Sequence, residues 1–494
     1  MNTENRFNLI DEAWIPVVDV GLVSLNEVFS NADLKSLGGN PIQKIAVIKL
    51  LLAIAQSAST PKDDDEWAEL GSDGLAKKCQ SYLKNWHDRF FLYGDKPFLQ
   101  MPAISKAKIQ SFGALQAEIA TGNSTVLLQS HIEKPLSEPE QALLLLTLMG
   151  FALGGKKTDN SVVLTPEYAG KSNDKGKAST GKAGPSVGFM GFLHNFLLGQ
   201  SIQETIWLNM QTTQQLVAQP MYSEGLGLPP WQAMPMGESC AVAKALQNSV
   251  MGRLLPLSRF CLLADTGMHY SEGIAHRGYK EGMADPSISV DFSGKEPKAI
   301  WVDPEKRPWR YLTALLGFVG LAGQQGFDCY QLRMGLFRAR KQVAKLGIWS
   351  GGLRVSSNAG EQYVSGSDDF VESTLMLPND VLGSLWYANF QHEMNELDQL
   401  SKIIYSATLN FFKTQKSEGK DQASLASNLF WQLCERKSQE LINACDEPES
   451  MKHLRSYFAQ CVYRAYDQFC AQDTARQLDA WAKNRPQLRN YLKD

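Results

Sequence analysis

Glycine nearly disappears from the last quarter of the chain. Only two of the 39 glycines in the 494-residue sequence lie after Asp380, and the apolar residues beyond it recur at helical spacing. Glycine weakens a helix interior, and amphipathic spacing is typical of helices that pack on one face. This part of the chain therefore predicts a helical bundle, with segments at roughly 380–414, 420–445, 449–471 and 472–492.

The residues before this point have a mixed pattern. Apolar spacing predicts helices at 40–60, 138–151, 187–198 and 308–323, and short apolar runs predict strands at 254–263, 288–292 and 299–302. A chain of this length exceeds what one core usually supports. We therefore predict an α+β fold, with a large mixed N-terminal domain at 1–378 followed by a C-terminal four-helix bundle at 379–494.

Residues 169–184 read AGKSNDKGKASTGKAG and contain no large apolar side chain. A phosphate-binding loop needs a glycine five positions before a Gly-Lys-Ser/Thr triplet. The nearest match is Gly176 with Gly181 and Lys182, but Ala183 stands where the magnesium-binding hydroxyl is needed. Two main interpretations are left, a flexible linker and a surface that contacts the backbone of a nucleic acid.

The net charge of −3 and the pI near 6.2 exclude a global field that attracts nucleic acid. Such a function must depend on local patches, such as the basic run between Arg333 and Lys345. The first residues lack the basic start and continuous apolar run of a signal peptide, and the longest apolar stretches are interrupted or short. We expect a cytoplasmic protein that does not enter a membrane.

The sequence offers no recognisable catalytic constellation. The seven histidines show neither H-x-x-x-H nor H-E-x-x-H spacing, and G-x-S-x-G and G-x-G-x-x-G are absent. The eight cysteines form no C-x-x-C pair, so we expect free or buried thiols. These patterns favour a binding protein that has no catalytic activity, metal or cofactor.

An enzyme stays open as the alternative. It would be a cytoplasmic metal- or nucleotide-dependent hydrolase that uses the acidic run Asp63–Glu66 together with residues 169–184, here called the Gly-Lys stretch. The pairs His87 with Asp88 and His269 with His276 are weaker metal candidates. A third interpretation is a purely structural scaffold whose loops touch nothing.

Short stretches in a fixed order along the chain resemble one family. They are NLIDEAWIPV (8–17), IAQSASTPKDDDEW (54–67), FFLYGDKPFLQ (90–100), TGNSTVLLQSH (121–131), GQSIQETIWLNM (199–210), LPPWQ (228–232), Asp285-Pro286 and FWQLCERKSQELI (430–442). Over nearly its whole length the chain resembles the large, CasA-like subunit of Cascade, the type I-E CRISPR surveillance complex.

The resemblance implies a subunit without catalytic activity in an RNA-guided antiviral complex. Such a subunit recognises the protospacer-adjacent motif (PAM) in double-stranded target DNA and helps to open the duplex, so that guide RNA pairs and an R-loop forms. It then recruits a separate helicase-nuclease. The implied partners are the target DNA, the 5′ end of the guide RNA, and the capping, small and backbone subunits of the complex.

The resemblance also implies a glycine-rich loop against the DNA minor groove, which falls on the Gly-Lys stretch. Glycine permits close approach of the backbone, and lysines contact phosphates without carrying sequence information. The expected residues are the glycines Gly181 and Gly184 and the lysines Lys171, Lys175, Lys177 and Lys182.

A lysine finger is expected in the minor groove, shortly before Asp285-Pro286. The simple register places Ile274 or Ala275 there, and neither is cationic. A nearby cation must therefore substitute, and the candidates are His276, Arg277 and Lys280. We favour Lys280, followed by Arg277, because a long cation reaches minor-groove acceptors.

Two further elements follow from the resemblance. A wedge hairpin that splits the first base pair begins at Gly351-Gly352, with Asn358 at its tip and Gln362 on the returning strand. A loop that docks on the guide RNA and its capping subunit is expected at Asn123, Ser124, Thr125, Leu127 and Leu128. The C-terminal bundle is expected to contact the small subunits.

Overall fold

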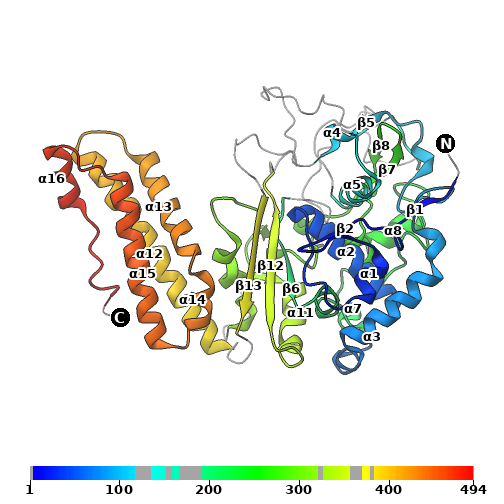
Figure 1. The fold of residues 1–494 in the computed structure, drawn as a ribbon, viewed down its shortest axis with the longest axis horizontal. Coiled ribbons are helices and arrows are strands. Elements are labelled where there is room, and N and C mark those ends of the chain that lie inside the picture. The colour runs from blue at the N-terminus through cyan, green and yellow to red at the C-terminus, as the bar shows by residue number, and fades with distance from the viewer. Residues whose placement is uncertain are drawn as a thin grey trace. The chain divides into compact units, whose positions relative to one another are not determined.

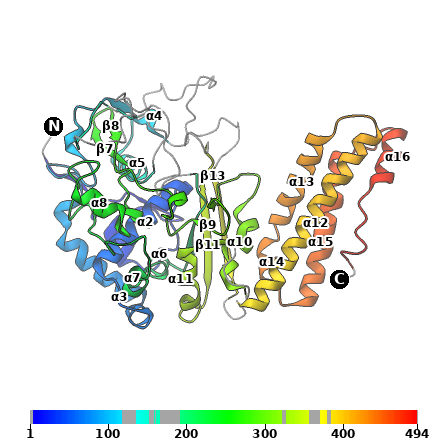
Figure 2. The same cartoon turned by 180° about the vertical axis from the view of Figure 1, so that it is seen from behind.

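The computed structural model describes residues 4–116, 135–151, 158–159, 161–165, 191–320, 326–355, 370–378 and 383–492. The chain divides into two compact units, which are drawn from opposite sides in Figures 1 and 2. Unit 1 comprises Met1–Pro308 and Gln325–Thr374, and unit 2 comprises Trp309–Gln324 and Leu375–Asp494. The mixture of helices and strands followed by C-terminal helices confirms the predicted α+β class. The predicted boundary at 378/379 adjoins residues 379–382, which are outside the described residues, and it stays a prediction.

Unit 1 combines short helices and strands with one long buried helix. Its helices are α1 (Leu25–Ser30), α2 (Pro41–Ala58), α3 (Asp64–Asn85), α4 (Phe112–Leu115), α5 (Glu138–Gly150), α6 (Ile202–Leu208), α7 (Thr213–Val217), α8 (Ala241–Gln247), α9 (Met251–Leu254) and α11 (Tyr330–Ala339). Its strands are β1 (Arg6–Asn8), β2 (Ile15–Val17), β3 (Gly21–Val23), β4 (Phe91–Tyr93), β5 (Ile109–Ser111), β6 (His194–Leu198), β7 (Arg259–Ala264), β8 (Gly267–Glu272), β9 (Ser289–Asp291), β10 (Lys298–Ala299), β11 (Phe327–Cys329), β12 (Leu346–Leu353) and β13 (Phe370–Leu377), whose last residues belong to unit 2. The strands form small sheets in the orders β1-β4, β2-β3, β5-β8-β7, β10-β9-β11 and β13-β12-β6.

Helix α2 lies at the centre of unit 1. Asn40 caps its start, because the Asn40 side chain accepts from the Gln43 amide while the Gln43 side chain accepts from the Asn40 amide, both at 3.0 Å. Among the described residues α2 is the one helix long and apolar enough to cross a membrane, but 78% of it is buried inside the protein. It packs against α3, α5, α6, α9 and β12. The predicted helix at 40–60 is therefore confirmed as a core helix.

The predicted helix at 187–198 is wrong in its described part. Residues His194–Leu198 form β6 instead, which pairs antiparallel with β12 from Gly347 opposite Leu198 to Gly351 opposite His194. A short apolar run suits a buried strand or a buried helix equally well by periodicity. A partner strand far along the chain decides the outcome here.

The helix predicted at 308–323 is confirmed only in part. Its described residues form the short α-helix α10 (Leu312–Leu315) between two 3-10 helices, Pro308–Tyr311 and Gly317–Val319. The Trp309 ring packs against that of Trp431, with centroids 5.8 Å apart, so this segment is fixed by tertiary packing. The strands predicted at 288–292 and 299–302 correspond to β9 and β10. The strand predicted at 254–263 is confirmed only in its last part, which belongs to β7, because its first residue ends helix α9.

Apart from the last residues of β13, unit 2 forms helices in its described part. Besides α10 it contains α12 (Ser384–Thr414), α13 (Lys420–Glu435), α14 (Ser438–Ala444), α15 (Pro448–Phe469) and α16 (Ala475–Asn484). Helices α12, α13 and α15 pack pairwise along their lengths (Figure 1). The helix predicted at 420–445 is interrupted between α13 and α14, where the Lys437 amide donates to the Cys434 carbonyl at 3.0 Å in a tighter turn. A buried ion pair of 2.6 Å between Arg455 and Glu393 joins α15 to α12.

Part of the basic run at 333–345 belongs to the core. Arg338 on α11 lies over the Trp67 ring at 4.3 Å and pairs with the Asp64 carboxylate at 3.1 Å. The rings of Trp67 and Trp207 stack 4.1 Å apart, and each indole N–H donates to the carbonyl oxygen of the other residue at 2.9 Å. Arg338 therefore joins α11 to α3 and is not available to a partner.

Lys49 of α2 forms a buried ion pair with Asp285, in which the two side chains are 6% and 1% exposed. Lys49 also donates to the Arg253 carbonyl oxygen at 3.3 Å, and Asp285 accepts from the amide and hydroxyl of Ser287 at 2.9 and 2.6 Å. Burial acts to raise the pKa of the Asp285 carboxyl, but Lys49 and His194 outweigh it and hold that pKa below its ordinary value. The pair fixes the segment after Asp285 to the core helix.

We expect Lys49→Met to lower the free energy of unfolding of the protein by about 3–5 kcal/mol, because it leaves a buried carboxylate without its partner. Adding Asp285→Leu to Lys49→Met should cost much less than Asp285→Leu costs alone. Urea unfolding of the wild type, both single variants and the double variant, followed by tryptophan fluorescence, measures this coupling. Effects that simply add would contradict it.

Candidate nucleic-acid interface

Strand β6 brings together three segments that the sequence assigned to DNA contact. Its first residue, His194, lies opposite Gly351 near the end of β12, from which the predicted wedge hairpin departs. On its other side His194 bridges to Ile288, and the Asn195 amide donates to the Ser287 carbonyl at 2.7 Å, just after the predicted finger. The Gly-Lys stretch itself ends shortly before β6. The bases of all three elements therefore meet at one end of one small sheet.

The Gly-Lys stretch has anchored ends on both sides. Before it, the buried Glu238 carboxylate accepts from the amides of Leu164 and Thr165, the shorter bond being 2.8 Å. A Cβ on Gly237 would lie 2.5 Å from the Thr165 hydroxyl, so the glycine permits this approach. After the stretch, the Gly191 carbonyl accepts from the Val302 amide at 3.0 Å.

The predicted contact residues of this loop are not among the described residues. They are Lys171, Lys175, Lys177, Gly181, Lys182 and Gly184. Their role stays a prediction, and the structure supplies only the positions from which the loop starts and ends.

The predicted finger is a short segment with alternating burial. Ile274 and Tyr279 are buried, and the Tyr279 ring meets the Phe192 ring edge-on with centroids 5.5 Å apart. Because Phe192 lies at the start of the described segment that follows the Gly-Lys stretch, this contact fixes the finger beside the start of that segment. Between and after the buried anchors, Arg277 and Lys280 are exposed.

The two exposed cations of the finger differ in their surroundings. The Arg277 guanidinium lies 4.0 Å from the Glu281 carboxylate, and both side chains are largely exposed, so the pair is weak. Lys280 makes no ion pair with any residue that the structure describes. The Lys280 charge is therefore more available to a ligand than the Arg277 charge. This agrees with the choice of Lys280 as the finger cation, which stays a prediction.

His276 was named as a possible cation of the finger, and this expectation is wrong. Its imidazole is buried, with Nε2 2.6 Å from the Pro256 carbonyl oxygen and Nδ1 3.5 Å from the Arg253 guanidinium. Burial and the neighbouring Arg253 charge lower the pKa of His276 to about 3. A neutral imidazole that donates from Nε2 to the carbonyl satisfies this geometry, so His276 anchors the finger.

The base of the predicted wedge hairpin is a pair of neighbouring strands, β12 and β13. Gly351 and Gly352 lie inside β12 and not in a turn. A Cβ on Gly351 would lie 2.7 Å from the Trp349 ring, so the glycine lets that indole lie along the strand. The proposed contact residues Asn358 and Gln362 are outside the described residues and stay predictions.

The predicted RNA-docking residues are likewise outside the described part of the chain. They are Asn123, Ser124, Thr125, Leu127 and Leu128. Helix α5, which follows them, begins as predicted at Ser137, whose amide donates to the Glu140 carboxylate at 2.9 Å in a capping box.

The side chains that a hydrolase would use are engaged in other contacts. Asp63 caps α3 by accepting from the Glu66 amide at 3.0 Å, and Asp64 pairs with Arg338. The ring of His87 lies 2.7 Å from the Asp11 carboxylate. Across the described residues no three His, Cys, Asp or Glu side chains are placed to hold a metal ion, and the eight cysteines are free thiols.

Sequence reasoning missed two buried charges that hold the site in place, Lys49 and Glu238. The sequence did indicate a buried role for Lys49, because a lysine inside a continuous apolar helix needs a buried partner. Nothing in the sequence indicated the role of Glu238, since its partners are backbone amides more than seventy positions earlier in the chain.

The buried His276 predicts a specific dependence of stability on pH. The pKa of His276 is lowered to about 3 in the folded protein from 6.5, so the unfolded chain binds one more proton between these values. Stability therefore falls as the pH drops below about 6.5, by up to about 1.4 kcal/mol per pH unit from this group. In urea unfolding, we expect the free energy of unfolding of His276→Gln to depend less on pH between pH 6 and 4 than that of wild type. The control His453→Gln, at an exposed histidine, should behave as wild type. Parallel curves for all three proteins would contradict a buried neutral His276.

Comparison with known proteins identifies a family that this chain matches over most of its length. A family model described as CRISPR-associated protein Cse1 matches residues 8–472. A curated relative from Thermus thermophilus, "CRISPR-associated protein CasA/Cse1", is 25% identical over 341 residues. The match covers 64% of this chain and spans 61% of the relative's length.

Solved structures share the fold. The crystal structure of Thermobifida fusca Cse1 superposes with a TM-score of 0.77 at 18% identity and covers 99% of this chain and 98% of that one. A chain of a "CRISPR RNA-guided surveillance complex" superposes with a TM-score of 0.71 at 14% identity, over 98% of this chain and 99% of that one.

Proposed function

The chain belongs to the family of CRISPR-associated Cse1 proteins, and we propose that it is the large, non-catalytic subunit of a Cascade-type, RNA-guided surveillance complex. In this role it recognises a protospacer-adjacent motif in double-stranded DNA and helps to open the duplex for R-loop formation. It then recruits a helicase-nuclease. The relative that forms part of a "CRISPR RNA-guided surveillance complex" supports the assignment to such a complex.

One observation carries the DNA-contact proposal, namely the meeting of three loop bases at the start of β6. His194 is opposite Gly351 and bridges to Ile288, so the described base of the predicted wedge hairpin and the segment after the finger both lie against β6, which follows the Gly-Lys stretch in the chain. Loops on a rigid scaffold that converge on one place are the usual arrangement of a binding site. A duplex that reached one of these loops would be within reach of the others.

We assign different roles to the three loops. The lysines of the Gly-Lys loop hold the duplex by its phosphates, which gives affinity without sequence preference. Lys280, with Arg277 beside it, reads the minor groove of the motif, and Asn358 and Gln362 form the wedge. The loop at 123–128 docks on the 5′ end of the guide RNA and its capping subunit, and the helices of unit 2 contact the small subunits.

Changing Lys171, Lys175, Lys177 and Lys182 together to alanine should weaken duplex binding by the assembled complex roughly tenfold or more, about 1.4 kcal/mol, for every DNA sequence. The plot of log affinity against log salt should become shallower by about one for each phosphate that the variant no longer neutralises. A control in which the exposed Lys77, Lys78, Lys84 and Lys96 become alanine removes the same charge elsewhere. If wild type and the loop variant had equal affinity and an equal salt slope, the Gly-Lys stretch would be a linker and not a DNA contact.

Lys280→Ala should act differently, because a base-reading contact carries sequence information. We expect affinity for DNA that contains the motif to fall by about 1–3 kcal/mol, and affinity for motif-free DNA to change little. Arg277→Ala should cost less, because Glu281 already lies within 4.0 Å of that guanidinium. Gel-shift titrations of the assembled complex on both duplexes measure the difference. An equal reduction on both duplexes would show that Lys280 only contacts phosphate.

A further inference from the structure

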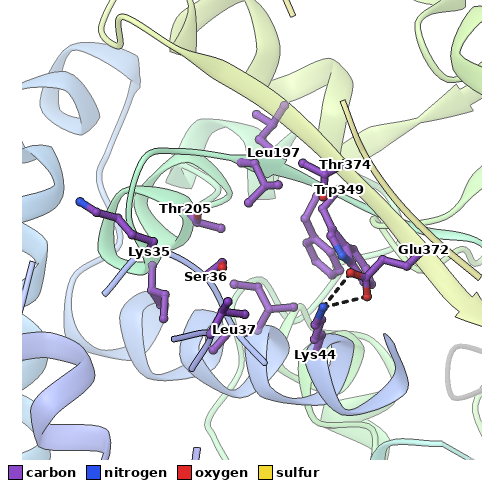
Figure 3. Close-up of a pocket in the computed structure, with 14 residues that line it drawn as sticks. Lys35, Ser36, Leu37, Lys44, Leu197, Thr205, Trp349, Glu372 and Thr374 are labelled. Atoms are coloured by element: carbon purple, nitrogen blue, oxygen red, sulfur yellow. Dashed lines mark hydrogen bonds and ion pairs between the residues drawn. The ribbon is translucent and has the colours of Figure 1, made fainter. Parts of the chain in front are cut away.

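Unit 1 contains a pocket of about 280 Å³ beside the sheet formed by β6, β12 and β13 (Figure 3). Helix α2 and the loop at residues 35–37 close its other sides (Figure 3). Its lining is largely apolar and includes Leu37, Ile48, Phe196, Leu198, Ile202 and Trp349. The pocket is on the small side for a drug-sized ligand, and it has room for one or two large side chains.

The polar groups of the pocket are few. Lys44 donates to both oxygens of Glu372, at 2.7 and 2.8 Å, and this pair joins α2 to β13 (Figure 3). Trp349 is 8% exposed, and its indole N–H has no acceptor among the described residues. Lys35, which also lines the pocket, is exposed and forms no ion pair with a described residue. The pocket therefore offers one spare positive charge beside apolar walls.

An exposed apolar hairpin adjoins the pocket. Between and within β2 and β3, three aliphatic side chains stand in solvent, Val18, Val20 and Leu22, with exposed fractions of 43%, 59% and 48%. Val18 also lines the pocket, and its amide donates to the Ser36 carbonyl at 3.0 Å. Val18 thus belongs both to the hairpin and to the lining of the pocket. Contiguous exposed apolar groups of this kind mark contact sites for other proteins.

We propose that the hairpin and the pocket form a docking surface for another protein subunit, which inserts a large apolar side chain beside Trp349 and places a neighbouring carboxylate at Lys35. The charge balance of the rim supports this occupant, because the Lys44 charge is matched by Glu372 and the Lys35 charge is left over. The inference rests on the proposed function, since the partner is a subunit of the same RNA-guided complex.

The chemistry of the surface disfavours other occupants. A nucleotide needs several donors for its phosphates, and among its described lining residues this pocket offers one unmatched lysine. A nucleic acid strand needs a row of cations, which the aliphatic hairpin does not supply. An apolar anchor in a pocket with an ionic contact at its rim is the usual structure of a protein hot spot.

The location gives the docking surface a mechanical consequence. Trp349 belongs to β12 and Glu372 to β13, and these two strands are the base of the predicted wedge hairpin. A side chain inserted beside Trp349 therefore packs against both strands and the core helix at once. Docking would stiffen the base of the hairpin from the side of α2.

The test uses the guide-RNA complex assembled without this subunit as the probe, and measures the affinity of the added chain. Val20→Asp with Leu22→Asp should raise the Kd about tenfold or more, and the pocket-filling Leu198→Trp should do the same. Lys35→Glu should have a smaller effect, of a few-fold. The matched control is Val217→Asp with Leu228→Asp, which changes two aliphatic residues of unit 1 with 80% and 60% exposure and should leave the Kd within about twofold. Circular dichroism melting of each variant checks that the chain is folded.

A photo-cross-linking amino acid at Val20 in the assembled complex identifies the occupant. We expect one cross-linked segment, in another protein subunit, with a large apolar residue and an Asp or Glu close by. A cross-link to this same chain, or to a second copy of it, would overturn the proposal. So would unchanged Kd values for the variants while the wild type binds, and in that case the proposed function would stand. A wild-type chain that does not join the complex would overturn both.

Discussion

The ion pair between Lys49 and Asp285 is the contact on which the arrangement of unit 1 depends most. Helix α2 is largely apolar, and apolar packing alone fixes its rotation weakly because many similar side chains fill the same space. The buried Lys49 ammonium must meet a carboxylate, and its pairing with Asp285 favours one rotation and one position along the helix axis. Asp285 in turn holds Ser287, whose carbonyl accepts from β6. The core helix and the end of the sheet at which β6 begins are thus linked through three consecutive contacts.

This linkage explains how loops with little to bury are presented in a defined place. A segment such as AGKSNDKGKASTGKAG cannot stabilise its own conformation by apolar burial. Its ends are held instead, by Glu238 before it and by strand contacts of Gly191 after it. The finger is held in the same way, by the buried ring of Tyr279 and the neutral imidazole of His276. The cations stay solvated while the buried neighbours set their position.

The sequence predicted those elements whose stabilisation is local. Helices α2 and α5 were found because their caps and apolar spacing lie within one stretch of chain. Strand β6 was mistaken for a helix because its partner, β12, lies far along the chain. The burial of His276 and Arg338 was missed for a related reason, since the carbonyl of Pro256 and the carboxylate of Asp64 become their neighbours only in the folded protein. The motif resemblance predicted the three loops, and the structure was required to show that the described segments next to them meet at β6.

The structure also separates residues whose substitution would disturb the fold from loop segments whose length and sequence can vary. The register of β6 with β12 and the ion pair of Asp285 lie in the buried scaffold, where a change of one residue would displace several neighbours. Insertions in the connecting segments cost little, because the entropy of closing a loop grows only slowly with its length. Under the proposed function, a longer hairpin or a shifted cation in the finger changes which bases are reached without changing the fold. The choice of DNA motif would then be a property of loop length and sequence, and the scaffold would determine only the point from which each loop starts.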